Sequence, residues 1–342
     1  MKFERSLVEG EYLRDILSQP RAIADTVEGL RSSPEVGSAE GFRRIVLTGM
    51  GGSLHALVPL HIRLVERGFP AMVLETAELL HYFPSVLTPE TLLIPVSQSG
   101  RSAEIVRLLD RAAGARTIGV TNTPGSPLAE RTDATVMMRA GTESSVSCKT
   151  FLATLVALEW LAAMLCRDDR RRTEDILQSA AAAAEHYLAG WENKVAELTD
   201  ILRGVRDLFV VGRGNSMATA GTGGLILKES THFHAEGMSS PAFRHGPFEM
   251  SGPQTVVLVC TGDARTAALN ENLVRDVRAA GGLAYLIGAN SDVEAFRIAQ
   301  VDGAIRPVLE MLPVQMVSLA LGALAGREPG KFELLTKVTT VE

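Results

Sequence analysis

The sequence predicts an α/β protein made of two similar halves, each with a parallel β-sheet covered by helices. Short apolar runs alternate with amphipathic stretches of helical spacing, and this alternation of strand, loop and helix is typical of parallel sheets. The halves also share two pairs of similar segments. RIVLTGMGGSLHA is similar to LFVVGRGNSMATA, and LLDRAAGARTIGVTN is similar to VRDVRAAGGLAYLIGAN, which indicates an internal duplication.

Each expected strand is a short apolar run that ends at small or polar residues. The expected strands are Arg44–Thr48, Leu92–Val96, Thr117–Thr121, Leu208–Val211, Thr255–Cys260 and Leu283–Ile287. After Ser99, the residues Ile105, Leu108, Leu109 and Ala112 recur on one face of a predicted helix. Residues 167–203 are rich in Ala, Glu and Arg without Pro, so we expect a long helix there. The predicted division is a first domain at 1–166, a helical connection at 167–203, a second domain at 204–328 and a tail at 329–342.

Composition narrows the class of protein. The chain has 342 residues, long enough for two domains or for one large α/β domain. It is 46% hydrophobic and 22% charged, with a net charge of −6, which is ordinary for a soluble globular protein. No basic run suggests a nucleic-acid or membrane partner. The first twenty residues lack the apolar core of a signal peptide, and the apolar stretch Phe151–Cys166 is too short to span a bilayer. The three cysteines, Cys148, Cys166 and Cys260, lie far apart, so we expect a cytoplasmic protein.

The first candidate site is the loop 49–53, Gly-Met-Gly-Gly-Ser, between a strand and a helix. Backbone N–H groups at a helix N-terminus attract anions. A dinucleotide fingerprint would need a third glycine where Leu54 stands, and Met217 stands there in the second copy, so a nicotinamide cofactor is not expected. A tight turn without a ligand is the remaining alternative.

The second candidate site is the loop 97–102, Ser-Gln-Ser-Gly-Arg-Ser, again at the carboxyl end of a strand. Hydroxyls, an amide and free helix N–H groups together form a hydrogen-bonding site for a phosphate that needs no metal. A serine at a helix start is often only a cap. Three serines in six residues exceed what capping requires, so the pattern favours phosphate binding.

The third candidate region contains Glu229, His232, His234, Glu236 and His245. The two His at i and i+2 would point to different sides of a helix, and no HExxH spacing occurs, so we expect no metal. Glu229 and His245 suit proton transfer on a sugar if they are partly buried. The alternative, that both are solvated surface groups, is the one that composition alone favours.

Four motifs in order resemble those of the SIS (sugar isomerase) family: GMGGS, SQSGRS, LILKESTHFHAEGMSSPAFRHGP and the terminal KVTTVE. The resemblance starts with the expected helix that ends in Ser18-Gln19-Pro20 and runs to Glu342. It is strongest to the isomerase half of glucosamine-6-phosphate synthase and its stand-alone deaminase and deglycase relatives. It implies two tandem flavodoxin-like SIS domains with parallel sheets flanked by helices, and a C-terminal tail that enters the active site. It also implies that no cofactor is needed.

The resemblance assigns roles to particular residues. The phosphate is held by Ser53, Ser97, Gln98, Ser99 and Ser102. The sugar is lined by Gly51, Gly52, Glu143, Val146 and Ser147. Glu229 is the base that moves a proton between C1 and C2, and Lys337 meets the carbonyl carbon as an imine. His245 assists ring opening and comes from the other subunit, so the resemblance implies a homodimer.

The resemblance implies a phosphosugar substrate and a deaminase that converts glucosamine 6-phosphate to fructose 6-phosphate and ammonia. Because no amidotransferase domain precedes the isomerase half, we expect no glutamine hydrolysis. Ile226 replaces a family lysine, and residues 332–334 replace the family's Pro-Arg-Asn, so the exact substrate stays open. The alternatives are a fructosamine-phosphate deglycase, another ketose/aldose phosphate isomerase, and a non-catalytic phosphosugar sensor. Retention of Glu229, His245 and Lys337 together disfavours the sensor.

Overall fold

The computed structural model describes residues 5–112, 114–301, 303–334 and 336–338, and its contacts divide the chain into two compact units. The first unit comprises residues 19–143, 149–181 and 334–342. The second unit comprises residues 1–18, 144–148 and 182–333. The sequence-based boundaries at 166, 203 and 328 stay predictions. Within the predicted tail, residues 335 and 339–342 lie outside the described residues.

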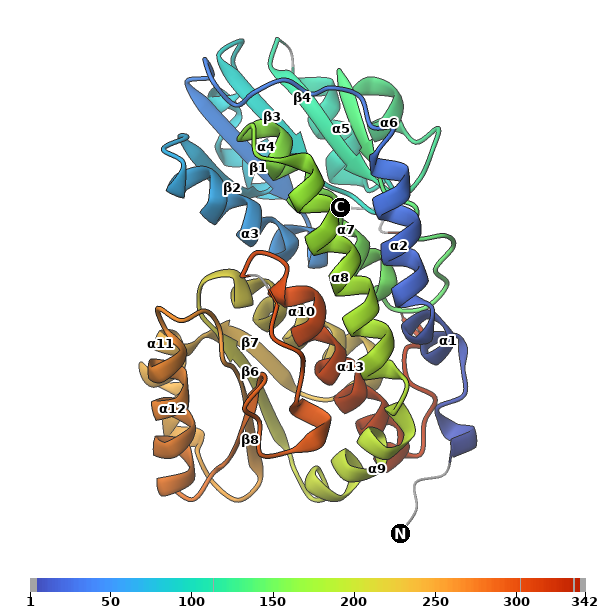
Figure 1. The fold of residues 1–342 in the computed structure, drawn as a ribbon, viewed down its shortest axis with the longest axis vertical. Helices are drawn as coiled ribbons and strands as arrows, with labels where there is room; N and C mark the ends of the chain where they lie inside the picture. The colour runs from blue at the N-terminus through green and yellow to red at the C-terminus, as the bar shows by residue number, and fades with distance from the viewer. Residues whose placement is uncertain (1–4, 113, 302, 335, 339–342) are drawn as a thin grey trace. The chain divides into compact units, whose positions relative to one another are not determined.

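The first unit contains a five-stranded parallel sheet in the order β2-β1-β3-β4-β5 (Figure 1). The strands are β1 (Arg44–Gly49), β2 (Ala71–Glu75), β3 (Thr91–Pro95), β4 (Arg116–Thr121) and β5 (Ala134–Met137). This is the flavodoxin-like order, and the direction of the chain across the sheet reverses between β1 and β3. Loops leaving these two strands at their carboxyl ends diverge, and open α/β sheets bind ligands at such a point.

Helices cover both faces of the first sheet. One face carries α2 (Gln19–Leu30), α3 (Gly52–Glu66) and α7 (Lys149–Leu165), and the other carries α4 (Thr76–Tyr82), α5 (Ala103–Arg111) and α6 (Pro127–Arg131). Val46 and Leu93 of the sheet pack with Leu79 and Leu108 of α4 and α5. Every residue of α7 is buried, which explains the apolar stretch Phe151–Cys166 as a core helix.

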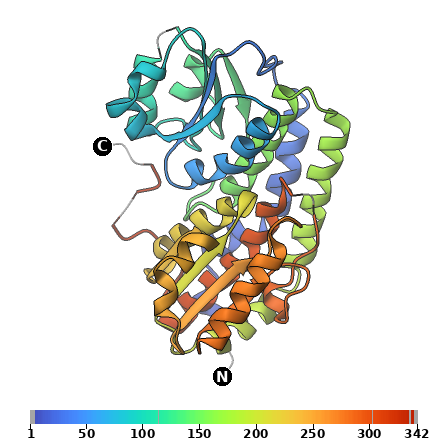
Figure 2. The same ribbon diagram turned by 90° about the vertical axis from the view of Figure 1, so that its left-hand side faces the viewer.

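The second unit contains a four-stranded parallel sheet in the order β7-β6-β8-β9, visible in yellow to orange in Figure 2. Its strands are β6 (Asp207–Gly212), β7 (Ala235–Ser239), β8 (Thr255–Cys260) and β9 (Leu283–Ile287). The order repeats that of the first four strands of the other sheet, with β6 and β8 in the places of β1 and β3. The predicted α/β class and the predicted duplication are thus confirmed.

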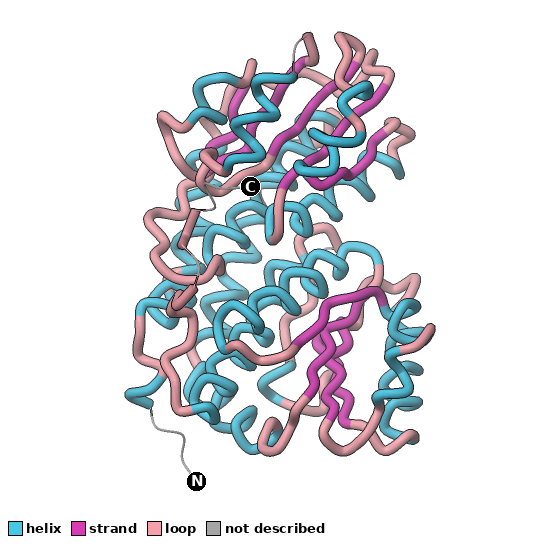
Figure 3. Tube along the Cα trace, turned by 180° about the vertical axis from the view of Figure 1, so that it is seen from behind, coloured by secondary structure: helices cyan, strands magenta, loops and turns pink. Residues whose placement is uncertain are grey.

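Two groups of helices cover the second sheet, as the tube in Figure 3 shows. One group is α9 (Trp191–Ile201), α10 (Met217–Thr231) and α13 (Arg306–Ala325), and the other is α11 (Ser240–Arg244) and α12 (Ala267–Ala279). Phe243 and Leu273 of α11 and α12 pack on Phe209 and Val257 of the sheet. The short elements are α1 (Glu11–Leu17), η1 (Arg5–Leu7), η2 (Pro84–Val86), η3 (Gly214–Ser216), η4 (Pro247–Met250) and η5 (Glu294–Phe296).

The segment between the halves differs from the predicted single long helix. It forms two helices, α8 (Arg170–Leu188) and α9, with a break at residues 189–190. Gly190 is the N-cap residue of α9. Glycine has a low helix propensity, which favours an interruption at this position.

Among the described residues, α13 is one helix whose length and composition would allow it to cross a membrane. However, 83% of its most apolar window is buried inside the protein, as is usual for a core helix. It packs against α10 and α9, so its apolar character is explained by the core of the second unit.

Candidate active site

The loop after β3 presents two of the predicted phosphate-binding serines. The backbone N–H of Gly100 donates to Ser97 Oγ at 3.1 Å, and that of Arg101 donates to Ser99 Oγ at 3.2 Å. Each hydroxyl therefore accepts a bond from the loop and keeps its own hydrogen to donate. Gly100 has φ +62° and a Cβ there would lie 2.2 Å from Ser126 Oγ, so this tight turn requires glycine.

The other predicted phosphate residues gather at the same edge of the first sheet. Ser53 lies in the first turn of α3, directly after β1, with Gly51 as the N-cap residue and Gly52 as the first residue of the helix. Ser102 is the N-cap residue of α5, but its side chain makes no cap hydrogen bond. Since β1 and β3 are adjacent parallel strands, both loops leave at neighbouring carboxyl ends.

The hydroxyls of Ser97 and Ser99 give a direct prediction. Changing either serine to alanine should weaken phosphosugar binding by roughly 10- to 150-fold, because a hydrogen bond to a charged group contributes roughly 1.5–3 kcal/mol. Isothermal titration calorimetry with glucosamine 6-phosphate measures this change. Ser38→Ala, in a loop of the same unit whose hydroxyl contacts the carbonyl of Leu165, is the matched control. Unchanged affinity in both site variants would contradict the assignment.

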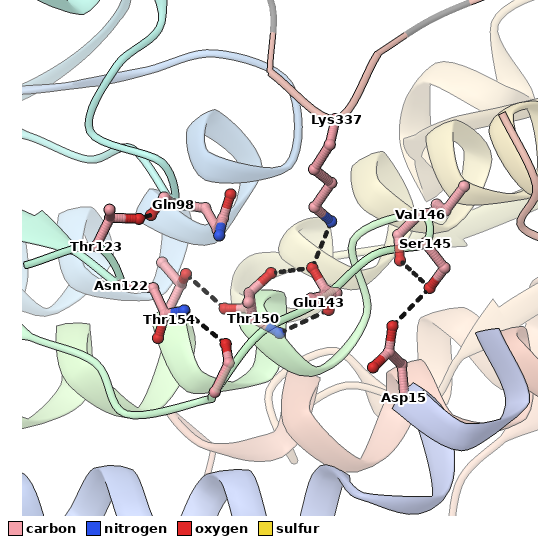
Figure 4. A network of polar contacts seen from close by, with 11 residues as sticks. Asp15, Gln98, Asn122, Thr123, Glu143, Ser145, Val146, Thr150, Thr154 and Lys337 are labelled. Carbon is pink, nitrogen blue, oxygen red and sulfur yellow. Dashed lines mark hydrogen bonds and ion pairs between the residues drawn. The ribbon is translucent and has the colours of Figure 1, made fainter. Parts of the chain in front are cut away.

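Asn122 links the loop 97–102, called the serine loop below, to a second polar cluster. The carbonyl of Gln98 accepts from the N–H of Asn122 at 3.1 Å. The Asn122 side chain accepts from the N–H of Ala140 at 3.0 Å and donates to the carbonyl of Gly141 at 2.9 Å. Asn122 thereby fixes the chain two residues before Glu143 to the serine loop (Figure 4). We did not single out Asn122 from the sequence.

Glu143 is the centre of the second cluster (Figure 4). Its fully buried side chain accepts from Thr150 Oγ1 at 2.5 Å and from the Thr150 N–H, at the start of α7, at 3.1 Å. The Nζ of Lys337, on the C-terminal tail, lies 2.6 Å from Glu143 Oε2. A carboxylate at a helix N-terminus is well stabilised there, so Glu143 gives the tail lysine a rigid partner within the first unit.

The segment that follows Glu143 belongs to the second unit. The N–H of Val146 donates to the carbonyl of Gly330 at 3.4 Å, and Ser145 Oγ donates to Asp15 at 2.8 Å. Ser147, which the resemblance placed along the sugar, is half-buried in the same unit. Gly330 also donates to the carbonyl of Ser230 at 2.8 Å, so the root of the tail is fixed beside the residue that follows Glu229.

Glu229 is half-buried in the last turn of α10. That helix lies directly on β7, because glycines meet at the contact: a Cβ on Gly237 would come within 1.9 Å of the Ala220 carbonyl. The close contact holds the backbone that carries Glu229. Ile226, which replaces a family lysine, is 1% exposed, so it fills the core of this unit.

His245 lies in the same unit as Glu229 but on an exposed turn. It follows α11 as the C-cap residue, and Ser239 caps the start of that helix by accepting from the N–H of Ala242. The neighbouring Arg244 donates to Asp276 at 2.6 Å. His245 is thus an exposed residue at the end of a short anchored helix.

The predicted helical placement of His232 and His234 is wrong. The helix α10 ends at Thr231, and His232 adopts a left-handed conformation with φ 54° as its C-cap residue. His234 lies before β7, 3.6 Å from Asp207 and 3.8 Å from Glu236, and its side chain is 63% exposed. The two histidines therefore belong to a helix-to-strand connection.

The two halves of the sequence match one known domain. The sequence profile of the SIS domain matches residues 41–164 and 201–320, which together are well over half of the chain. The chain belongs to the SIS-domain family. The two matched ranges correspond to the two parallel sheets, so the SIS domain occurs twice in tandem.

Several proteins similar to this chain are named as enzymes of phosphosugars. A glutamine–fructose-6-phosphate aminotransferase (isomerizing) from Pyrococcus horikoshii is 30% identical in an alignment 357 residues long that covers 99% of this chain and 59% of the relative. The chain thus spans about three fifths of the length of such relatives. The solved C-terminal domain of glucosamine-fructose-6-phosphate aminotransferase from Francisella tularensis has a TM-score of 0.81 at 22% identity, covering 96% of this chain and 99% of that one. A glucosamine-6-phosphate deaminase from Thermotoga maritima has a TM-score of 0.81 at 18% identity, covering 97% and 100%.

In the second SIS domain, the serine that corresponds to Ser53 contacts a buried carboxyl group. Ser216, the counterpart of Ser53 in the repeat, donates to Glu310 Oε1 at 2.8 Å, and Thr219 donates to Oε2 at 3.0 Å. Glu310 on α13 is fully buried, and this burial raises its pKa to about 7. Asp263 lies in the loop 261–266, which follows β8 as the loop 97–102 follows β3. It accepts a hydrogen bond from Arg265 at 2.6 Å, which lowers the pKa of Asp263.

Burial of Glu310 predicts a pH-dependent stability. Because its pKa is raised when folded, the folded chain binds more protons than the unfolded chain, and the free energy of unfolding falls as pH rises from about 4.5 to about 7. The full loss above that range is about 3 kcal/mol. Glu310→Gln should therefore be more stable than the wild type at pH 8 and equally stable at pH 4.5, as measured by urea unfolding.

Two neighbouring groups affect Glu310. The thiol of Cys260 on β8 has its own pKa raised well above its usual value by burial, and the positive charge of Arg306 on α13 opposes the rise in the pKa of Glu310. Glu249→Gln, at an exposed position of the same unit, is the control and should leave the pH profile unchanged. A Glu310→Gln protein with the wild-type pH profile would contradict the assignment.

Proposed function

We propose that this SIS-family chain deaminates glucosamine 6-phosphate to fructose 6-phosphate and ammonia. The observation that carries the proposal is the ion pair between Lys337 and Glu143. Asn122 connects this pair through hydrogen bonds to the serine loop of the same unit. A phosphate-binding loop and a lysine within one unit suit chemistry on the carbon chain of a phosphosugar.

The first stage is opening and isomerisation of the sugar. The serine loop binds the phosphate, and His245 moves protons at the ring oxygen and the C1 hydroxyl so that the ring opens to the aldehyde. Glu229 then removes the proton at C2 and returns it at C1, while the C1 carbonyl oxygen gains a proton and the C2 amine loses one. This transfer converts the C2 amine of the aldose into an imine at C2 of a ketose, with no net gain or loss of electrons.

The second stage is release of ammonia. Lys337 passes a proton to Glu143, and its neutral Nζ adds to C2. The C2–nitrogen bond of the original amine breaks, ammonia leaves with a proton, and an imine to Lys337 remains. Water then adds to C2 and the bond to Lys337 breaks, which yields fructose 6-phosphate and the free lysine. One water is consumed for each ammonia released.

A substrate panel tests the proposal. The chain is incubated with glucosamine 6-phosphate, fructose 6-phosphate and a 6-phosphorylated fructosamine that carries an amino acid. The proposal predicts ammonia and fructose 6-phosphate from the first compound. Release of the amino acid from the fructosamine alone would favour a deglycase, and interconversion of ketose and aldose without ammonia would favour a simple isomerase. Binding without any turnover would favour a sensor.

The same proposal includes a homodimer in which His245 acts in the site of the partner. The exposed turn that carries His245 suits such a role. We predict that inactive Glu229→Gln and His245→Ala proteins regain activity when their subunits exchange, because one site in each mixed dimer then has both residues. Native mass spectrometry verifies that mixed dimers form. Mixed dimers without recovered activity would contradict the shared site.

A further inference from the structure

We infer that Glu310 occupies the position of a bound phosphate in the second SIS domain and closes this half of the protein to phosphosugars. The inference rests on the proposed function only for the class of ligand. Its basis is the duplication: β6 and β8 stand in the places of β1 and β3, and α10 follows β6 as α3 follows β1. The chain therefore offers two comparable loop pairs, and we expect only the first to bind a phosphate.

The hydrogen bonds at Ser216 are those that an oxyanion would accept. The hydroxyl of Ser216, at the start of α10, donates to one oxygen of Glu310 at 2.8 Å. The hydroxyl of Thr219, one turn further along, donates to the other oxygen at 3.0 Å. A negative group beside the first turn of a helix is stabilised by the helix dipole. The carboxyl group of Glu310 thus lies at the place beside this helix end where an anion would bind.

The loop after β8 lies close to the same place. A Cβ built on Gly262 would lie 3.3 Å from Asn270 Nδ2, 3.3 Å from Thr266 Oγ1 and 3.9 Å from Ser216 Oγ. Asn270 is fully buried and donates to the carbonyls of Cys260 and Thr261, so it holds this loop against the end of β8. The loop after β8 therefore lies beside Ser216, whose hydroxyl donates to Glu310.

A phosphate at Ser216 would meet two obstacles. The carboxyl group of Glu310 already fills the space next to the hydroxyls, and its charged form would repel a dianion. Asp263 would also repel a dianion, but it is the weaker obstacle because it is paired with Arg265 within the loop. Glu310 is thus the residue that decides whether the second half accepts a phosphate.

The test uses chains in which the first site is disabled by Ser97→Ala and Ser99→Ala together. Inorganic phosphate and glucosamine 6-phosphate are titrated separately, and binding is followed by ³¹P NMR and calorimetry. With Glu310 intact we expect no binding in the millimolar range. Adding Glu310→Ala should create a weak site for inorganic phosphate, with affinity at least roughly tenfold above the parent chain. Adding Ser216→Ala should remove the new site.

Two further chains control for volume and folding. Glu310→Gln keeps the volume of the side chain, so this variant should stay closed to phosphate. Glu310→Ser removes volume and should open the site, so it replaces Glu310→Ala if that protein fails to fold. A folded Glu310→Ala or Glu310→Ser chain that gains no phosphate binding would overturn the inference. Binding of phosphate at Ser216 with Glu310 intact would also overturn it, and this measurement needs no substitution at Glu310. If the wild type binds no phosphosugar, the proposed function fails. The titrations of the Glu310 variants with inorganic phosphate still decide the role of Glu310 in that case.

Discussion

Replacement of Lys337 by Met is expected to lower the rate of ammonia release by roughly 10³-fold or more, because it removes the amine that attacks C2. Binding of glucosamine 6-phosphate should remain measurable, since Ser97 and Ser99 hold the phosphate independently of the tail. Removal of all residues after Thr336 should have the same effect. Steady-state kinetics and calorimetry on the same preparations separate the loss of turnover from any loss of binding.

Two variants sharpen this expectation. Lys337→Arg keeps a positive charge beside Glu143 but cannot form an imine, so it should also be inactive. Lys331→Met changes an exposed lysine six residues earlier and should have nearly wild-type activity. Glu143→Gln should reduce turnover less than Lys337→Met, because the lysine loses its proton acceptor but keeps its amine. Substantial activity in Lys337→Met would show that the tail lysine does no chemistry.

Replacement of Glu229 by Gln is expected to lower the rate by at least roughly 10²-fold, the usual minimum for a general base. The amide has nearly the same shape as the carboxylate, so α10 and its contact with β7 should be preserved. In deuterated water the wild type should exchange the C1 or C2 proton of the sugar with solvent. Glu229→Gln should lose this exchange while still binding the phosphosugar.

Glu236→Gln is the matched control for this experiment, because Glu236 is an exposed carboxylate on β7 of the same unit. It should exchange protons at the wild-type rate. Circular dichroism and thermal melting verify that the Glu229→Gln chain is folded. If Glu229→Gln exchanges as fast as the wild type, Glu229 is not the base that moves the proton.

The buried central strands could be predicted from the sequence, but of the edge strands of the two described sheets only β9 was predicted. The expected runs at 44–48, 92–96, 117–121 and 255–260 match β1, β3, β4 and β8 within one residue at each end. The strands β2, β5 and β7 were missed, and each lies at an edge of its sheet. The residues of β7, Ala-Glu-Gly-Met-Ser, have low strand propensity, because Gly237 is needed for the approach of α10.

The serine loop could be predicted because its chemistry is concentrated in six consecutive residues. Asn122 was missed because its role depends on a neighbouring strand, although its position directly after a predicted strand was a usable signal. Thr150 was missed because only the fold brings the start of α7 to Glu143. Glu310 was missed as well, and its signal was a lone acidic residue inside a long apolar helix.

Reduction of the protein with sodium borohydride in the presence of fructose 6-phosphate tests the central claim most directly. The hydride converts an imine between Lys337 and C2 into a stable amine, and mass spectrometry of peptides then locates the sugar phosphate. We predict a single modified lysine, Lys337, and a loss of labelling at low sugar concentration when Ser97 and Ser99 are both alanine. Labelling at another lysine, or no labelling of a protein that releases ammonia from glucosamine 6-phosphate, would contradict the account.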